Sequence, residues 1–326
     1  MKTLVLSMIS IAAIVAAMTA CTSESDPIND ITNPKDAKVE IKLNAGVVNV
    51  ETKAQIVPKP ITGTTFSEAT QVPLLRLEGA TSPTWSTATN PTNATITGSN
   101  VVLDDSQKFY PAESDTKVYF IGYYPSTGSY TSGIVSYTGI VGETDILCTP
   151  ETCVGSKHEP ASSPSLQFNH MLSQVEIKLK GDVAAQNAFG KIKKIELVNI
   201  PTSLDLTLGS TIAIAAKNDS PIQNIAVYDN ATGTNLTTTA TTIGETAMIY
   251  NGGSQKYGTS ANSLEIKITY GDTNTTSIVN VNNMTTGLET GKKHVITLSF
   301  KEKIEVSSAI TEWDTSTGES GNGEVG

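Results

Sequence analysis

Few side chains in this 326-residue chain are suited to chemistry, and the cysteines are the most informative of them. Cys148 and Cys153 stand five residues apart, a spacing that fits a disulfide closing a small loop in an oxidising compartment. A metal site is the alternative, but zinc takes four ligands, and His158 is the one further candidate nearby. We therefore expect a disulfide between Cys148 and Cys153, no metal and no cofactor.

Cys21 stands at the end of a segment typical of export signals. Lys2 is followed by an apolar run from Leu4 to Ala17 and then by small residues, and this run is too short for a membrane-spanning helix. The segment resembles a lipobox signal, in which the cysteine becomes the new N-terminus and carries the lipid; a plain secretory signal peptide is the alternative. We expect residues 1–20 to be removed and Cys21 to carry acyl chains such as palmitate, which anchor the chain without crossing the membrane.

Residues 21–36 are predicted to form an acidic linker after the lipidated cysteine. The cluster Ser23-Glu24-Ser25-Asp26 resembles the surface-export signals of some Gram-negative lipoproteins, although a solvated linker has the same composition. The expected location is therefore the outer face of the cell outer membrane.

The charge balance argues against nucleic acid as a partner. Asp and Glu outnumber Lys and Arg by 32 to 22, the formal net charge is −10, and Arg76 is the only arginine. A phosphate-binding surface needs clustered basic side chains, and a membrane-surface helix needs a basic polar face. The sequence offers neither of them.

Motifs typical of enzymes are also missing from the sequence. It has no Gly-x-Ser-x-Gly elbow, no His-Glu-x-x-His and no phosphate-binding glycine loop. The three histidines, at 158, 170 and 294, leave little for acid–base catalysis. Asp104-Asp105 is expected to be a surface pair, and Asp229 to Asn235 a turn, because it lacks the glycine and distal glutamate of a calcium loop. We expect no enzymatic activity.

Apolar and polar residues alternate with a period of two along most of the chain, which predicts short strands joined by Gly, Asn and Pro turns. The clearest strands are centred on Ile41, Phe120, Ile177, Ile266, Val279, Leu298 and Val306. The segment 118–125 is apolar on both faces, residues 264–281 read as a hairpin, and only Asp182 to Phe189 reads as a helix. The pattern predicts an all-β protein with two antiparallel sandwiches, at 37–162 and 163–326, connected through 157–164.

The most distinctive segment runs from Leu166 to Leu179 and contains Phe168, His170 and Leu172. His170 lies on an apolar strand face, where a neutral imidazole that donates and accepts one hydrogen bond is expected to be structural. The pattern Phe-x-His-x-Leu-Ser-x-Val-x-Ile-x-Leu is similar to the opening strand of the C-terminal domain in the fimbrillin family, the type V pilus subunits.

Three further segments carry the same resemblance in the same order. They are Val118–Pro125, Thr144–Leu147, and the stretch from Leu288 through Ile304 to Trp313. With the lipobox, the resemblance covers residues 1 to about 315. His294 departs from the family pattern, because many relatives have tyrosine there. Either aromatic ring is able to pack on the apolar face of a strand.

The resemblance implies two antiparallel Greek-key, transthyretin-like β-sandwich domains and a structural role in a pilus that serves cell adhesion. Such subunits reach the surface as lipoproteins and assemble after a protease removes the N-terminal segment with its first strand. A strand from a homologous subunit then fills the gap, which is β-augmentation in physical terms. The implied partners are other pilus subunits, the outer membrane through the lipid anchor, and a ligand on a host or bacterial surface.

The removed strand is expected to carry Val39, Ile41 and Leu43 on its inward face. Relatives are commonly cut after arginine, but no arginine precedes Arg76 here. Lys53 is the best substitute as a cleavage site, and a surface lysine in a turn is the alternative interpretation.

A second hypothesis is a surface lipoprotein that binds glycans, or a pilus-tip adhesin. Stacking on sugar rings requires exposed aromatic side chains. Trp85 and Tyr130 are the only obvious candidates, and Trp85 lies in a loop that is equally able to fold back on its domain.

Overall fold

The computed structural model describes residues 38–48, 61–62, 65–301 and 303–312. The chain is all-β in these residues, as the sequence predicted, with one α-helix, α1 (Val183–Phe189), and one short 3-10 turn at Trp85–Thr87. None of the described helices is long and apolar enough to cross a membrane.

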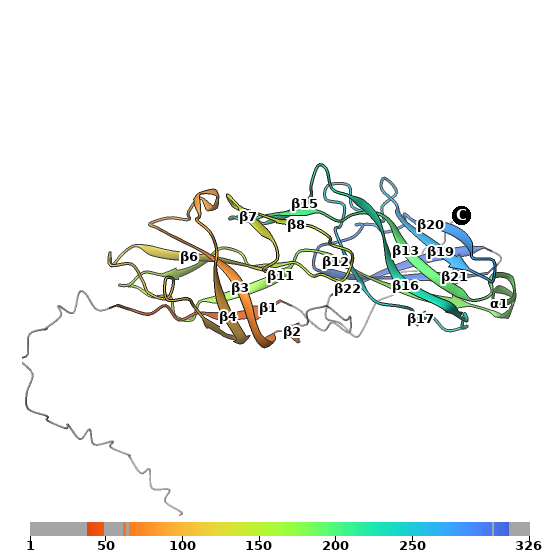
Figure 1. The fold of residues 1–326 in the computed structure, drawn as a ribbon, viewed down its shortest axis with the longest axis horizontal. Helices are drawn as coiled ribbons and strands as arrows, with labels where there is room; N and C mark the ends of the chain where they lie inside the picture. The colour runs from red at the N-terminus through yellow and green to blue at the C-terminus, as the bar shows by residue number, and fades with distance from the viewer. Residues whose placement is uncertain (1–37, 49–60, 63–64, 302, 313–326) are drawn as a thin grey trace, which may run out of the picture. The chain divides into compact units, whose positions relative to one another are not determined.

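The first sheet is built mainly from the N-terminal half of the chain (Figure 1). Its strands are β1 (Asn44–Val47), β2 (Ile61–Thr62), β3 (Thr65–Gly79), β4 (Thr92–Gly98), β5 (Asn100–Val102), β6 (Lys117–Tyr124), β9 (Leu147–Cys148), β10 (Thr152–Gly155) and β11 (Ser165–His170). Their order is β10-β6-β9-β11-β1-β5-β4-β3-β2, and β6 also pairs with β3. Seven of these strands, β3, β4, β5, β1, β11, β9 and β6, therefore form a closed ring of pairings around a core that includes Phe66, Phe120 and Phe168.

The expected strand at 118–125 is confirmed as β6, and its two apolar faces belong to different cores. Phe120 points into the core enclosed by the ring, whereas Ile121 and Tyr123 pack in a second core on the opposite side. Successive side chains of a strand alternate between faces, so a strand that is apolar throughout has to be covered on both.

The second core lies under a small sheet that draws strands from both halves of the chain. The sheet contains β7 (Ser129–Thr131), β8 (Ile134–Tyr137), β14 (Leu204–Thr207) and β15 (Ala213–Ala216), in the order β15-β14-β8-β7. β14 pairs with β8 from Leu204 with Tyr137 to Thr207 with Ile134. The alternation of apolar and polar residues in the sequence did not predict this sheet.

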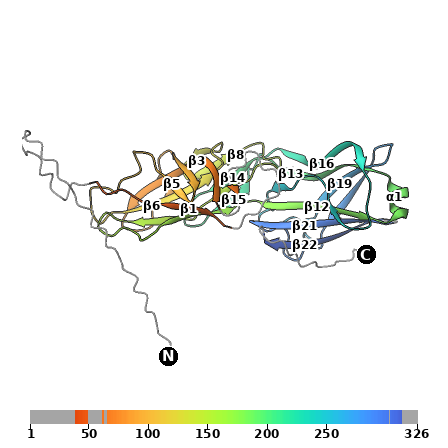
Figure 2. The same ribbon diagram turned by 90° about the horizontal axis from the view of Figure 1, so that it is seen from below.

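The C-terminal half forms two further sheets over a third core (Figure 2). One has the order β17-β12-β21-β22, with β18 also paired to β12, and comprises β12 (Ser173–Gly181), β17 (Thr241–Thr242), β18 (Ala247–Ile249), β21 (Lys292–Phe300) and β22 (Ile304–Glu312). The other has the order β16-β13-β19-β20 and comprises β13 (Ile192–Pro201), β16 (Ile222–Thr234), β19 (Leu264–Tyr270) and β20 (Thr275–Val281).

Two local predictions in this half are confirmed. The helix begins after Asp182, whose side chain accepts the Ala185 N–H at 2.8 Å, and it ends at Phe189, just before Gly190, which has a φ of 65°. The predicted hairpin is β19 followed by β20, paired from Leu264 with Val281 to Tyr270 with Thr275.

The expectation of purely antiparallel sheets is wrong at two places. β1 runs parallel to β11, and β12 runs parallel to β21. Alternation places side chains on faces in the same way in both kinds of ladder, so the sequence pattern does not distinguish them. Segment 157–164, expected to connect two sandwiches, instead joins β10 to β11 of the same sheet, and the chain reaches the third core only at β12.

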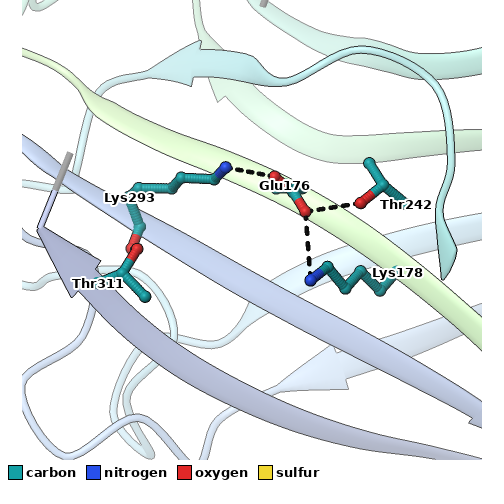
Figure 3. Close-up of polar contacts among 5 residues, drawn as sticks. All are labelled: Glu176, Lys178, Thr242, Lys293 and Thr311. Atoms are coloured by element: carbon teal, nitrogen blue, oxygen red, sulfur yellow. Dashed lines mark hydrogen bonds and ion pairs between the residues drawn. The ribbon is translucent and has the colours of Figure 1, made fainter. Parts of the chain in front are cut away.

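The parallel pair of β12 and β21 is held on its outer side by charges (Figure 3). Glu176 of β12 forms an ion pair with Lys293 of β21, accepts a hydrogen bond from Thr242 of β17 at 2.7 Å, and lies 3.7 Å from the Lys178 ammonium group. Burial alone would raise the pKa of Glu176, but the hydrogen bonds from Lys293 and Thr242 outweigh burial, so the pKa is lowered. One carboxylate thus joins three strands.

Candidate functional site

β1 occupies the position in the ring between β11 and β5. On one side it pairs in parallel with β11, from Asn44 with Ser165 to Val47 with Phe168. On the other side its registered pairing with β5 is Asn44 with Asn100, supported by the Ala45 N–H donating to the Ser99 carbonyl at 2.9 Å. β1 is therefore the strand that closes the ring between β11 and β5.

The inward face of the segment is the one that the sequence predicted. Ile41 and Leu43 are buried in the core, and Ala45 and Val47 continue the same face, while Val39 packs partly buried against it. The regular strand begins later than expected, at Asn44.

The segment before β1 pairs with a different part of the chain. Glu40 forms an isolated bridge with Phe109, the Tyr110 N–H donates to the Val39 carbonyl at 3.0 Å, and the Ile41 N–H donates to the Lys108 carbonyl at 2.7 Å. The expected strand is thus split into two short paired sections with a change of partner near residue 42.

The core behind β1 is closely packed around the Phe168 ring of β11. Phe168 meets Phe66 edge to face, with ring centroids 5.4 Å apart. At Gly122 of β6 an added Cβ would lie 2.9 Å from Phe168 and 2.8 Å from Leu74. The ring walls are therefore fixed by large side chains that do not belong to β1.

A groove of about 790 Å³ lies where the segment before β1 separates from β5. Residues 40–44 form one part of its lining, residues 100–103 another, and residues 161–164 a third. Asp105 and Lys108 also line it, and with Lys42 of the first part they make its surface polar as well as apolar.

Several predicted residues lie outside the described part of the chain. These are Cys21, the acidic linker at 21–36, Lys53 and Trp313. The chain is described again at β2, so the segment that contains Lys53 connects β1 with β2.

His170 lies at the end of β11, where its side chain is buried against Asp145. The Nδ1 atom of His170 is 2.6 Å from Oδ2 of Asp145, and Leu147, two residues after this aspartate, is paired with His170 in the ladder of β9 and β11. Leu172 is also fully buried, in the second core. All three motif residues are buried in the protein interior: Phe168, His170 and Leu172. The sequence did not predict the buried Asp145 carboxylate that faces His170.

A sequence model described as fimbrillin-like matches residues 52–313. The chain belongs to the fimbrillin-like family. No curated protein matches the chain.

Two solved structures share the fold of this fimbrillin-like chain. A putative cell adhesion protein from Bacteroides uniformis has a TM-score of 0.58 at 15% identity, covering 86% of this chain and 100% of the other. A putative cell adhesion protein from Bacteroides ovatus has a TM-score of 0.54 at 14% identity, with the same two coverages. At these identities the likeness concerns the fold.

The disulfide that the sequence predicted is not formed. Cys148 and Cys153 are both free thiols in the structure. Cys148 of β9 pairs with Tyr123, and Cys153 of β10 pairs with Tyr119, along the same strand β6. Four residues of a strand span about 13 Å, whereas a disulfide requires Cα atoms within about 7 Å. The segment between the cysteines is extended along β6 and does not form the small loop that the spacing indicated.

The aromatic residues expected to be exposed for glycan stacking are not available for it. Trp85 is only 3% exposed, and its indole N–H donates to the Glu151 carboxylate at 2.7 Å. Tyr130 packs partly buried against the second core, and its hydroxyl donates to the Ala88 carbonyl at 3.1 Å. The loop around Trp85 folds back on its own domain.

Proposed function

We propose that this chain is a structural subunit of a type V pilus, exported as a lipoprotein precursor and assembled by strand exchange after proteolysis, and that the pilus serves cell adhesion. The observation that supports this best is the position of β1. It closes a ring of strands, and the chain that follows it contains the candidate cleavage site Lys53.

Removal of residues up to Lys53 would open the ring between β11 and β5. Two strand edges with unpaired N–H and C=O groups would then flank an apolar gap, which is the arrangement that accepts an added strand. Burial of apolar surface is worth roughly 25 cal/mol per Å², so losing the inward side chains Ile41, Leu43 and Val47 leaves a deficit of several kcal/mol. Inserting a strand from another subunit recovers that free energy.

The same proposal accounts for control of assembly. In the intact precursor β1 fills its own site, so the precursor stays monomeric until it is cut. Acyl chains on Cys21 hold the precursor at the outer membrane until then, and the partners are other pilus subunits of the same or a related kind. The matched family supports a role in pili, whereas the anchor and the exchange step are our proposals.

We also propose two Greek-key, transthyretin-like sandwich domains, at 37–162 and 163–326, in which β1 with β11 and β12 with β21 are parallel pairs among antiparallel ones. The separate cores within the ring and within the C-terminal sheets support a division into two. Strand β11 and the pair β14 and β15 cross this division through their pairings with N-terminal strands.

Limited trypsin treatment of the purified precursor tests the exchange. We expect a truncated species that begins at Ala54 and polymerises into a ladder whose rungs differ by one subunit and resist mild detergent. The Lys53→Ala precursor, treated in the same way, should remain monomeric. A truncated wild-type product that stays a monomer at high concentration would rule out assembly by strand exchange.

A further inference from the structure

The contacts that hold β1 in the ring are unequal on its two sides. Four registered pairs join β1 to β11, from Asn44 with Ser165 to Val47 with Phe168. Within the described residues, one registered pair joins β1 to β5, Asn44 with Asn100. The β5 side is therefore the weaker boundary of the site.

Beyond this single pair, no registered pairing of the described residues occupies this edge of β5. β5 is fully paired with β4 on its other side, from Asn100 with Thr97 to Val102 with Thr95. Continuing the register from Asn44 and Asn100 would pair Leu43 with Val101, but the chain separates there and the groove of about 790 Å³ takes up the space. The N-terminal segment turns instead to Phe109, which Glu40 bridges.

The open edge also carries an exposed aliphatic side chain. Val102 is 57% exposed, and it lines the groove. A short strand that is unpaired along part of one side and carries an exposed β-branched residue is a template for pairing with another chain, unless a charge or a proline blocks it. Val102 has neither feature at its own position.

We infer that the free edge of β5 beside this groove is where a strand from a second copy of this chain first pairs, before it displaces β1. The inference rests on the proposed strand exchange and adds its order of events. The incoming strand pairs with β5 at Val101 and Val102 and then advances toward Val47, replacing first the single β5 pair and then the β11 ladder. Because each new pair forms as an old one breaks, the apolar core is never left open to water.

The order of events can be measured on precursor that trypsin has cut at Lys53, kept dilute so that it does not polymerise. The probe is a fluorescent peptide with the sequence of residues 38–48, which matches the native β1 site. We expect the rate of peptide uptake to rise in proportion to peptide concentration, because the peptide takes part in displacing β1. A rate independent of peptide concentration would mean that β1 leaves first, and would overturn the inference while leaving strand exchange intact.

Two matched variants locate the point of first pairing. Val102→Lys places a charge on the β5 edge and should slow uptake about tenfold, within the range over which interface changes alter association rates. Ile222→Lys is the control, because Ile222 is also 57% exposed and begins the edge strand β16, and it should leave the rate unchanged. Both variants should melt as the wild type does. Equal uptake rates for Val102→Lys and wild type would overturn the inference.

Two variant peptides give the same test without altering the protein. A peptide with Leu43→Pro is blocked where it would meet β5 first, and it should enter much more slowly. A peptide with Gly46→Pro carries the same change at the far end, and it should enter at nearly the wild-type rate and dissociate faster. The opposite ranking would overturn the inference, whereas no uptake of any peptide at any concentration would overturn the proposed function itself.

Discussion

The Nδ1 atom of His170 lies 2.6 Å from Oδ2 of Asp145, and both side chains are buried almost completely. The two residues lie on adjacent segments, because His170 ends β11 and Asp145 precedes β9. The pair thus joins β11 to the segment just before β9, close to the point where the chain continues into β12 of the C-terminal core.

His170→Gln should lower the free energy of unfolding by about 1–3 kcal/mol, because Asp145 loses its partner in a buried site. The precursor should still fold and be cut by trypsin. Chemical denaturation at neutral pH measures the change, with Asp145→Asn as the companion variant. A double variant no less stable than either single variant would show the coupling, whereas additive losses would contradict it.

Stability should fall as the pH drops below about 6.5 because of His294. Burial lowers the pKa of His294 to about 4, the positive charge of Lys256 adds to this lowering, and the negative charge of Glu289 opposes it only in part. The Glu289 N–H donates to Nε2, which must keep its lone pair to accept, so this hydrogen bond is made to the neutral ring. The unfolded chain takes up a proton near the ordinary value of 6.5 and the folded chain does not. His294 therefore contributes about 3 kcal/mol to the free energy of unfolding above pH 6.5, and this contribution is lost as the pH falls to about 4.

His294→Gln is the variant that isolates this effect, because the amide oxygen is still able to accept the Glu289 N–H. We expect the difference between wild type and variant to change with pH between 6.5 and 4 and to be constant above that window. Urea denaturation at a series of pH values measures it. A difference that does not vary with pH would show that His294 is accessible to protons in the folded state.

Glu176→Gln should weaken the C-terminal sheet at neutral pH by about 1–3 kcal/mol, because the charged hydrogen bond with Lys293 is lost. The pKa of Glu176 is lowered, so its contribution is present above the ordinary value near 4.5 and lost as the pH falls through the folded value. Wild type and variant should thus converge in acid. Glu305→Gln, which breaks the exposed pair with Lys301, is the control and should cause no measurable change.

The two cysteines of a recombinant chain that begins after Cys21 should react differently with a thiol reagent. Cys153 is exposed, whereas Cys148 is buried and burial raises the pKa of its thiol far above the ordinary value. One thiol should titrate in the native chain, and the second only after denaturation. Two slow thiols in the native state would contradict the exposure of Cys153.

The sequence predicted local features of this fold well, because alternation is a local property. The inward face through Ile41 and Leu43, the two-faced strand β6 and the helix after Asp182 all follow from residues close together in the chain. Alternation does not specify the neighbour of a strand. The pairing of β1 with β11 joins residues more than a hundred positions apart, so the closed ring was not predictable.

The wrong predictions about side chains have the same cause. The five-residue spacing of Cys148 and Cys153 favoured a small disulfide loop, although the segment between them runs extended along β6. Trp85 stands among polar residues, which indicated exposure, but its partner Glu151 comes from a distant part of the sequence. In both cases the deciding contact is not local.

The sheet shared by β8 and β14 determines how the chain should unfold. Tyr137 and Leu204 are paired across it and buried in the same core, so neither half of the chain retains a complete hydrophobic interior when the other is lost. We therefore expect the two halves to melt together, in a single calorimetric transition whose enthalpy equals the van't Hoff enthalpy. For a filament, this means that each subunit is one cooperative unit, and that partial denaturation of a subunit is not a stable state along the fibre.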